Sequence, residues 1–191
     1  MIWRRGGNAW FVLLVLANTS CRSDHAVDCH VLPNGQPARC IQNSDGRILV
    51  VRGSLARVEF GPEGLATIVV GERDLYFVTP NGTTAPAFRF DNGADYLVEG
   101  LARTVKDGKV GFVNSHLEIV APPVWDFAAP FERGVARVCV GCRSVPLGDE
   151  HSSVSGGKWG YIDKHGKVVV PVEFDERSLP SVEEAARLAA H

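Results

Sequence analysis

The sequence predicts an all-β protein built from tandem antiparallel β-hairpin repeats of about 35 residues. Three landmarks recur: an alanine in the first expected strand, an aromatic residue in the second, and an aromatic–aspartate pair after the third. Successive alanines are 36 and 34 residues apart, and the other two landmarks are both spaced 35 and 49. This agreement indicates a repeat architecture, in which each unit buries its apolar face against its neighbours. The landmarks are Ala66, Ala102 and Ala136; Phe77, Phe112 and Tyr161; and Phe90-Asp91, Trp125-Asp126 and Phe174-Asp175.

The third copy shows why each unit is expected to be β-structure. Trp159 and Tyr161 alternate with other residues at a period of two, which is the side-chain period of a strand. The polar run 163–166 ends in glycine, which can adopt the left-handed conformation that closes a short hairpin. The β-branched run 168–170 predicts a returning strand, which ends at Pro171 because proline has no amide hydrogen to donate.

The turns of the other two copies differ in sequence. The first copy has Pro80-Asn81-Gly82, with glycine again in the closing position. The second copy has Leu117 where the others have glycine. Because the left-handed conformation is costly for residues with a Cβ atom, we expect a looser or differently built turn there.

The third copy is longer than the others between its first and second strands. Ala102 and Gly111 are 9 residues apart, whereas Ala136 and Gly160 are 24 apart, so this copy carries 24 − 9 = 15 extra residues. We expect them to form a polar loop over 139–157. Recognition usually resides in a long loop on a rigid scaffold, so this insertion is the candidate binding loop. Its polar residues include Arg143, Asp149, Glu150 and His151.

The copies resemble the WG repeat, also called the KWG repeat, whose units read roughly Gly-x-Ala-x-Val, then Gly-Lys-Trp-Gly-Tyr-Ile-Asp, then Gly-Lys and a proline-to-aspartate stretch. The third copy matches this pattern closely over 157–163. The second keeps Gly111-Phe112 but has Val110 in the tryptophan's place, and the first has Leu75-Tyr76 in place of Trp-Gly. The resemblance covers about residues 60–176. It implies a β-hairpin array that acts as a binding or structural module, and it carries no chemistry by itself.

The recurring aromatic residues are expected to lie in the core of the repeats rather than to form a ligand platform. An aromatic at alternate strand positions packs against the next layer, and a glycine beside it permits close approach of another backbone. The recurring aspartates are expected to accept backbone N–H bonds at turns. The expected core residues are Phe77, Phe112, Trp125, Trp159, Gly160 and Tyr161, and the aspartates are Asp91, Asp126 and Asp175.

The first 20 residues resemble an export signal. An arginine pair precedes an apolar run of nine residues, 9–17, which is too short to span a bilayer because a spanning helix needs roughly 20. Cleavage after Ala17 by ordinary signal peptidase is one interpretation. The favoured one is a bacterial lipoprotein signal over 16–21, with lipidation of Cys21, although Asn18 departs from that pattern. We therefore expect an exported protein on the periplasmic face of the outer membrane, the alternative being a soluble periplasmic or secreted protein.

Cysteine parity favours lipidation. The chain has five cysteines, and committing the one at the signal boundary leaves four, an even number suited to an oxidising compartment. Among the three possible pairings we expect Cys29–Cys40 with Cys139–Cys142. A thiol-redox role for the second pair is an alternative, although such pairs usually begin a helix and this one follows a strand. A further alternative is that Cys139 and Cys142 bind a metal ion together with Cys29, His30 or Cys40.

The segments that flank the repeats are expected to differ from them. Residues 21–46 are polar and turn-rich, which predicts a tether with a cystine loop, and 47–60 predict two more strands. Ser181-x-x-Glu184 is a capping box that predicts a short helix. The predicted organisation is a signal peptide over 1–20, the tether over 21–46, the repeat domain over 47–176 and the helix over 177–191.

Composition excludes several classes of partner. Removing residues 1–20 removes two arginines and no acids, so the net charge becomes 18 − 22 = −4. A mildly acidic domain is a poor nucleic-acid binder. The chain has no nucleophile elbow and no phosphate-binding glycine loop. Asp149, Glu150 and His151 are interpreted as a solvated loop, so we expect no cofactor and no metal.

The sequence therefore predicts a non-enzymatic binding module of the cell envelope that recognises a protein or a cell-wall component. Contact with the membrane is expected only through a lipid anchor or the signal peptide. A sharper hypothesis is a periplasmic inhibitor or immunity lipoprotein directed against a toxin. The alternative from another class is a thiol-redox protein that uses Cys139 and Cys142.

Overall fold

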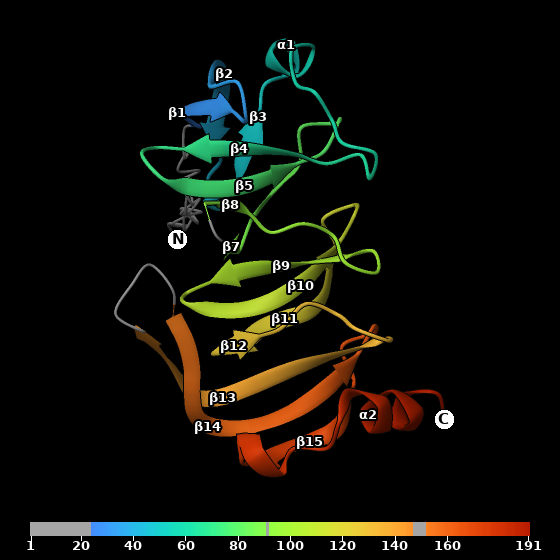
Figure 1. Cartoon of the computed structure of the whole chain (residues 1–191). Helices are drawn as coiled ribbons and strands as arrows, with labels where there is room; N and C mark the ends of the chain where they lie inside the picture. Colours follow the sequence, from blue (N-terminus) through green and yellow to red (C-terminus); the bar gives the residue numbers. More distant parts are fainter. Residues whose placement is uncertain (1–23, 91, 147–151) are drawn as a thin grey trace, which may run out of the picture.

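The computed structural model describes residues 24–90, 92–146 and 152–191, and its strands form antiparallel sheets, as predicted. Figure 1 shows these sheets stacked along one axis from the N-terminal to the C-terminal end. The strands are β1 (His25–Val31), β2 (Gln36–Gln42), β3 (Ile48–Val50), β4 (Ala66–Val70), β5 (Asp74–Val78), β6 (Thr84–Pro86), β7 (Arg89–Phe90), β8 (Gly93–Ala94), β9 (Leu101–Lys106), β10 (Lys109–Asn114), β11 (Ile119–Trp125), β12 (Phe127–Ala128), β13 (Val135–Pro146), β14 (Ser152–Asp163) and β15 (Val168–Phe174). The helices are α1 (Arg52–Leu55), the short 3-10 helix η1 (Glu176–Ser178) and α2 (Val182–Ala189).

Four three-stranded units make up the stack: unit I is β1–β2–β3, unit II is β4–β5–β6, unit III is β9–β10–β11 and unit IV is β13–β14–β15. Units II, III and IV are the three copies expected from the sequence. All four units use the same turn between their second and third strands. Each turn is closed by two backbone hydrogen bonds. The amide of the first residue donates to the carbonyl of the residue four positions later, and the carbonyl of the first residue accepts from the amide three positions later. These turns begin at Asn43, Thr79, Asn114 and Asp163.

Unit I corrects the predicted tether. The described part of 21–46 forms β1 and β2, and β1 pairs with β4 of unit II, so this segment belongs to the sheet. Cys29 and Val31 of β1 and Cys40 of β2 are buried in one core cluster, so the hairpin packs against the rest of the sheet. The turn at Asn43 precedes the one at Thr79 by 36 residues, so the repeat spacing extends to unit I. Unit I is hard to recognise in the sequence because Ile41 stands where the other units have an aromatic.

The turn of unit III was wrongly expected to be looser. Leu117 has φ 61° and donates its amide to the carbonyl of Asn114 at 2.9 Å, as the glycines do in the other turns. The side chain of Asn114 also accepts from the amides of His116 and Glu118, as Asp163 does in unit IV. The asparagine therefore holds the turn in place although leucine is unfavourable in a left-handed conformation.

Units I and II share a six-stranded sheet, in the order β3-β2-β1-β4-β5-β6, whose two ends meet. Leu49 forms an isolated bridge with Thr83, and the amide of Val50 donates to the carbonyl of Gly82 at 3.2 Å. The second strand expected within 47–60 is wrong, because 52–55 form α1. Ser54 accepts the amide of Arg39 at 2.8 Å, which ties this helical turn to β2.

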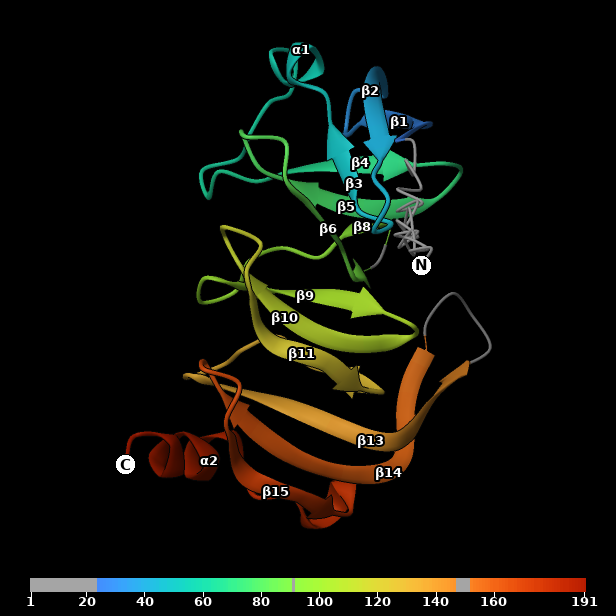
Figure 2. The same cartoon turned by 180° about the vertical axis from the view of Figure 1, so that it is seen from behind.

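Units III and IV follow along the stack, and α2 packs against unit IV (Figure 2). β12 joins unit IV, which gives the sheet order β12-β13-β14-β15. Ala185 of α2 is buried together with Tyr161 and Val170 of the sheet. The side chain of Ser181 accepts the amide of Glu184 at 3.3 Å, so the predicted helix and its N-cap are confirmed. Such a terminal element covers the outer face that a last repeat would otherwise expose.

Candidate functional site

Unit IV has an enlarged hairpin between its first and second strands. β13 and β14 span 12 residues each, whereas β9 and β10 span 6 each. The expected insertion over 139–157 was wrongly interpreted as a loop, because strand pairing continues from Cys142↔Gly156 to Pro146↔Ser152. Cross-strand pairing satisfies backbone groups that a loop would leave to water. We call residues 140–146 and 152–158 the hairpin extension.

The hairpin extension bends at three glycines. Gly141, Gly156 and Gly157 have φ of 79°, 75° and 69°, in the left-handed region that favours glycine. A Cβ atom on Gly157 would collide with the carbonyl oxygen of Val140 and the amide of Cys142. Beyond the bend the strands turn along the stack toward unit III (Figures 1 and 2). The glycines therefore set the direction of the extension.

A cystine spans this bend. Cys139 and Cys142 lie at disulfide-bonding distance on either side of Gly141, with Cα atoms 6.1 Å apart. Cys139 is fully buried and clusters with Trp159, so the bend is anchored in the core of unit IV. The other two cysteines, Cys29 and Cys40, lie at bonding distance across β1 and β2, also with Cα atoms 6.1 Å apart. The structure thus brings the four cysteines together in the expected pairs.

Beyond the bend, neither strand of the extension has a second strand neighbour within the described residues. β12 pairs with β13 at Val138 and Cys139, and the pairing of β15 with β14 begins at Trp159. Within the described ranges, both outer edges therefore present backbone groups that no neighbouring strand pairs. Such edges are templates on which an extended chain can add a strand.

One face of the extension carries exposed side chains. Arg143 pairs in register with Ser155, and Val145 pairs with Ser153, so these four residues share a face. Arg143 is exposed, and Val145 is 42% exposed. The remaining residues of the candidate binding site, Asp149, Glu150 and His151, lie outside the described residues.

The recurring aromatic residues of the second strands are buried, with Trp159 fully so. The indole Nε1 donates to the carbonyl of Gly156 at 2.8 Å. The guanidinium of Arg137 lies 4.6 Å from the ring centroid of Trp159, and Phe127 contacts that ring edge-on at 5.9 Å. These contacts leave no face of Trp159 to a ligand. The buried set is Phe77, Phe112, Trp159 and Tyr161, whereas Trp125 is half-buried.

In units III and IV the glycine beside the aromatic is required by the third strand of the unit. A Cβ atom on Gly160 would lie 2.5 Å from the carbonyl oxygen of Val170, and one on Gly111 would lie 2.6 Å from that of Ala121. The pairing register shifts next to both glycines, so the third strand bulges toward them.

The comparisons with known proteins agree with this geometry. The family described as "WG containing repeat" matches residues 111–141 and 159–176. These two segments are WG repeats. They contain Gly111 of unit III and the Trp159-Gly160 pair of unit IV, whereas units I and II lie outside the match. Comparison with curated proteins and with solved structures gave no match.

In units III and IV a lysine precedes the core residue of the second strand and pairs with the aspartate that follows the third strand. Lys109 lies 2.6 Å from Asp126, and Lys158 lies 2.9 Å from Asp175. Asp126 also accepts the amide of Gly141 at 2.7 Å, so unit III supports the base of the bend in unit IV. The hydrogen bonds from Lys109 and then Gly141 lower the pKa of Asp126. The sequence predicted backbone contacts for these aspartates but missed the lysines, and Asp91 lies outside the described residues.

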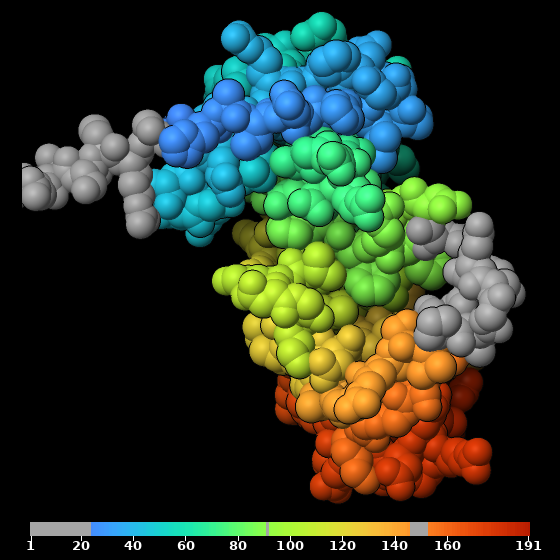
Figure 3. Space-filling model, turned by 90° about the vertical axis from the view of Figure 1, so that its left-hand side faces the viewer, coloured from blue at the N-terminus to red at the C-terminus, as the bar shows by residue number. Residues whose placement is uncertain are grey.

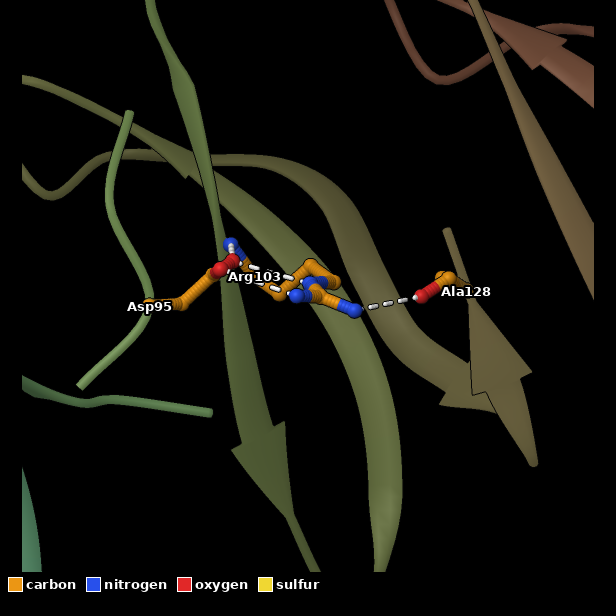
Figure 4. Close-up of polar contacts among 3 residues, drawn as sticks. All are labelled: Asp95, Arg103 and Ala128. Carbon is orange, nitrogen blue, oxygen red and sulfur yellow. Dashed lines mark hydrogen bonds and ion pairs between the residues drawn. The ribbon is translucent and has the colours of Figure 1, made fainter. Parts of the chain in front are cut away.

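A buried ion pair joins β9 of unit III to its neighbours, and nothing in the sequence singled it out (Figure 4). Arg103 and Asp95 are 3% and 4% exposed. The guanidinium donates from Nε and Nη2 to the carboxylate at 2.8 and 2.9 Å, and from Nη1 to the carbonyl of Ala128 at 3.1 Å. The ring of Phe88 lies 4.3 Å from the guanidinium carbon. With these partners in place, the pair has a structural role.

Three further points concern metal binding, membrane spanning and the signal peptide. The described ranges contain no group of three histidine, cysteine or acidic side chains placed to hold a metal ion. Within the same ranges, no helix is both long and apolar enough to cross a membrane. The predicted signal peptide and Cys21 lie outside the described residues.

Proposed function

We propose that this protein is a non-enzymatic binding module of the cell envelope, in which the stacked units are the scaffold and the hairpin extension recognises a protein or a cell-wall component. The observation that carries the proposal is the enlargement of one hairpin in an otherwise regular array. WG repeats supply the frame for units III and IV. The extension differs from that frame in length, direction and exposure, which are the properties of a recognition element on a rigid support.

Two features favour recognition by the extension. The glycine bend and the cystine restrict its orientation before binding, which reduces the entropy lost on association. Its unpaired edges offer backbone hydrogen bonds to an incoming strand, while Arg143 and Val145 offer side-chain contacts on one face. A protein segment that adds to this edge is therefore the favoured kind of partner.

Shortening the extension should abolish capture of the partner without unfolding the protein. Residues 144–155 are replaced by a brief glycine linker, which leaves Cys139, Cys142 and the WG core in place. The removed strand residues pair mainly with one another, so the other strands of unit IV keep their partners, and only Val154 is lost from the cluster around Trp159. The shorter connection itself costs tenths of a kcal/mol to about 1 kcal/mol, so the free energy of unfolding should change little. Capture is measured by pull-down from an envelope extract with the intact and the shortened protein.

The matched control for that experiment alters an exposed turn of similar polarity, by exchanging Lys164 and His165 for serine. This variant should capture the same partner as the intact protein. If the shortened protein binds the partner with unchanged affinity, recognition lies on the stacked units and the proposal for the extension is wrong.

Export and anchoring through Cys21 form the second part of the proposal. It rests on the signal pattern of residues 1–21 and on the two cystine pairs, which leave Cys21 as the fifth cysteine. Metabolic labelling with a palmitate analogue should mark the wild-type protein and should not mark a Cys21→Ser variant. A mature protein that begins at Asn18 and carries no label would contradict lipidation.

A periplasmic inhibitor or immunity lipoprotein is the sharper form of this proposal, and a neighbouring gene for a secreted toxin would favour it. The thiol-redox alternative receives less support. Cys139 is fully buried, and the Cys139–Cys142 pair lies on a strand rather than at a helix N-terminus, where a thiolate would be stabilised.

A further inference from the structure

The junction between units II and III differs from the junction between units III and IV. At the second junction the turn of unit IV packs directly on β11, where a Cβ atom on Gly166 would lie 2.7 Å from the carbonyl oxygen of Val120. At the first junction Leu117 occupies the glycine position, and its side chain packs into a cluster with residues of unit II, including Phe77. In unit IV the glycine of the turn lies directly against unit III. In unit III the side chain of Leu117 makes the contact with unit II.

The lysine–aspartate pair of units III and IV is also altered at the first junction. Asp74 stands at the position of Lys109 and Lys158, one residue before the core residue of the second strand. An aspartate cannot form the ion pair that supports the next junction. Two positions, one at the start of β5 and one in the β10–β11 turn, thus depart from the repeat pattern at this junction.

A cleft of about 730 Å³ opens at this junction, between the β4–β5 turn of unit II and the β9–β10 turn of unit III. Figure 3 shows the side of the molecule from which these turns project. The lining combines an apolar floor with a charged rim. The floor includes Leu75, Pro86, Ala87, Phe88 and Val105, and the rim carries Arg73, Asp74, Arg89, Lys106 and Asp107.

Cations outnumber carboxylates on the rim, three to two. Arg89 donates from Nη2 to the carbonyl oxygen of Arg73, which holds its guanidinium at the rim and leaves further N–H donors. Among the described residues, the side chains of Arg73 and Lys106 have no ion-pair partner. These cations converge from β7, β9 and the β4–β5 turn on one cleft of an otherwise acidic protein.

We propose that this cleft binds an extended peptide segment in which acidic side chains alternate with apolar ones. The acidic groups meet Arg73, Arg89 and Lys106, and the apolar groups lie on the floor. The lining also includes Tyr76, which is half-buried, and the guanidinium of Arg103 covers Phe88 at 4.3 Å. The three rim cations favour acidic groups over neutral ones, because they attract negative charge. None of the described residues of the hairpin extension lines the cleft.

The test uses fluorescence anisotropy of a labelled Glu-Leu-Asp-Phe-Glu peptide, with Lys-Leu-Lys-Phe-Lys as the matched probe. The acidic peptide should bind saturably and more weakly as salt rises, whereas the basic peptide should not bind. Lys106→Glu and Arg73→Glu should each weaken binding by about tenfold or more, because each replaces an attraction with a repulsion. Lys167→Glu, an exposed reversal outside the cleft, should leave it unchanged.

The protein with the shortened extension should bind the acidic peptide as the intact protein does, which separates this site from the proposed recognition element. Circular dichroism establishes that each variant is folded. Absence of saturable binding, equal binding of the basic peptide, or equal losses in Lys167→Glu and Lys106→Glu would each overturn the proposal.

Discussion

Replacing Trp159 with alanine is expected to lower the free energy of unfolding by about 3–5 kcal/mol, the usual cost of deleting a large core aromatic. The side chain is fully buried, and its loss would leave a cavity between Arg137, Phe127 and the cystine that anchors the bend. The indole hydrogen bond to Gly156 would also be lost. Gly160→Val should be similarly harmful, because its Cβ atom would press against the carbonyls of Val170 and Pro171.

Urea denaturation without reductant measures this effect, since both cystines then remain formed. Tyr96→Ala is the matched control, because Tyr96 is an aromatic residue that is 58% exposed. It should change the free energy of unfolding by no more than about 0.5 kcal/mol. Unchanged denaturation midpoints for Trp159→Ala and Gly160→Val would place these residues on the surface and would favour a ligand platform instead.

Replacing Asp95 with alanine is expected to cost about 3–5 kcal/mol, because Arg103 would remain buried without its counter-charge. Asp95 supplies acceptors for the guanidinium and also accepts the amide of Arg103 at 3.0 Å. The pair joins the segment between units II and III to β9, and Nη1 extends the network to Ala128 of β12. Its loss should therefore loosen the middle of the stack.

The control for Asp95 is the exposed pair of the same charge types, Lys158 with Asp175, whose side chains are 56% and 77% exposed. Lys158→Ala should cost no more than about 1 kcal/mol, because solvent screens this pair. Equal midpoints for Asp95→Ala and Lys158→Ala in urea denaturation would show that the buried pair contributes no more than a surface pair.

Much of the scaffold could be predicted because its determinants are local. A period-2 aromatic strand, a polar turn and a β-branched strand are sufficient to specify one unit, and their recurrence specifies the array. The C-terminal helix could be predicted for the same reason, since Ser181 and Glu184 form a capping box within four residues. Unit I is hard to recognise because it keeps the turn but replaces the aromatic landmark with Ile41.

The features that were missed depend on contacts between distant segments. The extension was interpreted as a loop because its serines and glycines resemble loop composition, whereas strand pairing between 142–146 and 152–156 decides its structure. Arg103 and Asp95 attract no notice in the sequence, because their burial follows from the packing of β9 between two units. Of the candidate binding residues, the structure places Arg143 on an exposed face, and Asp149, Glu150 and His151 remain a prediction.

The most direct test of the account is where the captured partner touches the protein. A photo-crosslinking amino acid is placed at Val145 on the extension or at Val168 on β15, two valines that are 42% and 44% exposed. After capture from an envelope extract, illumination should crosslink the partner to position 145 and not to position 168. Crosslinks from position 168 without any from position 145 would contradict recognition by the hairpin extension.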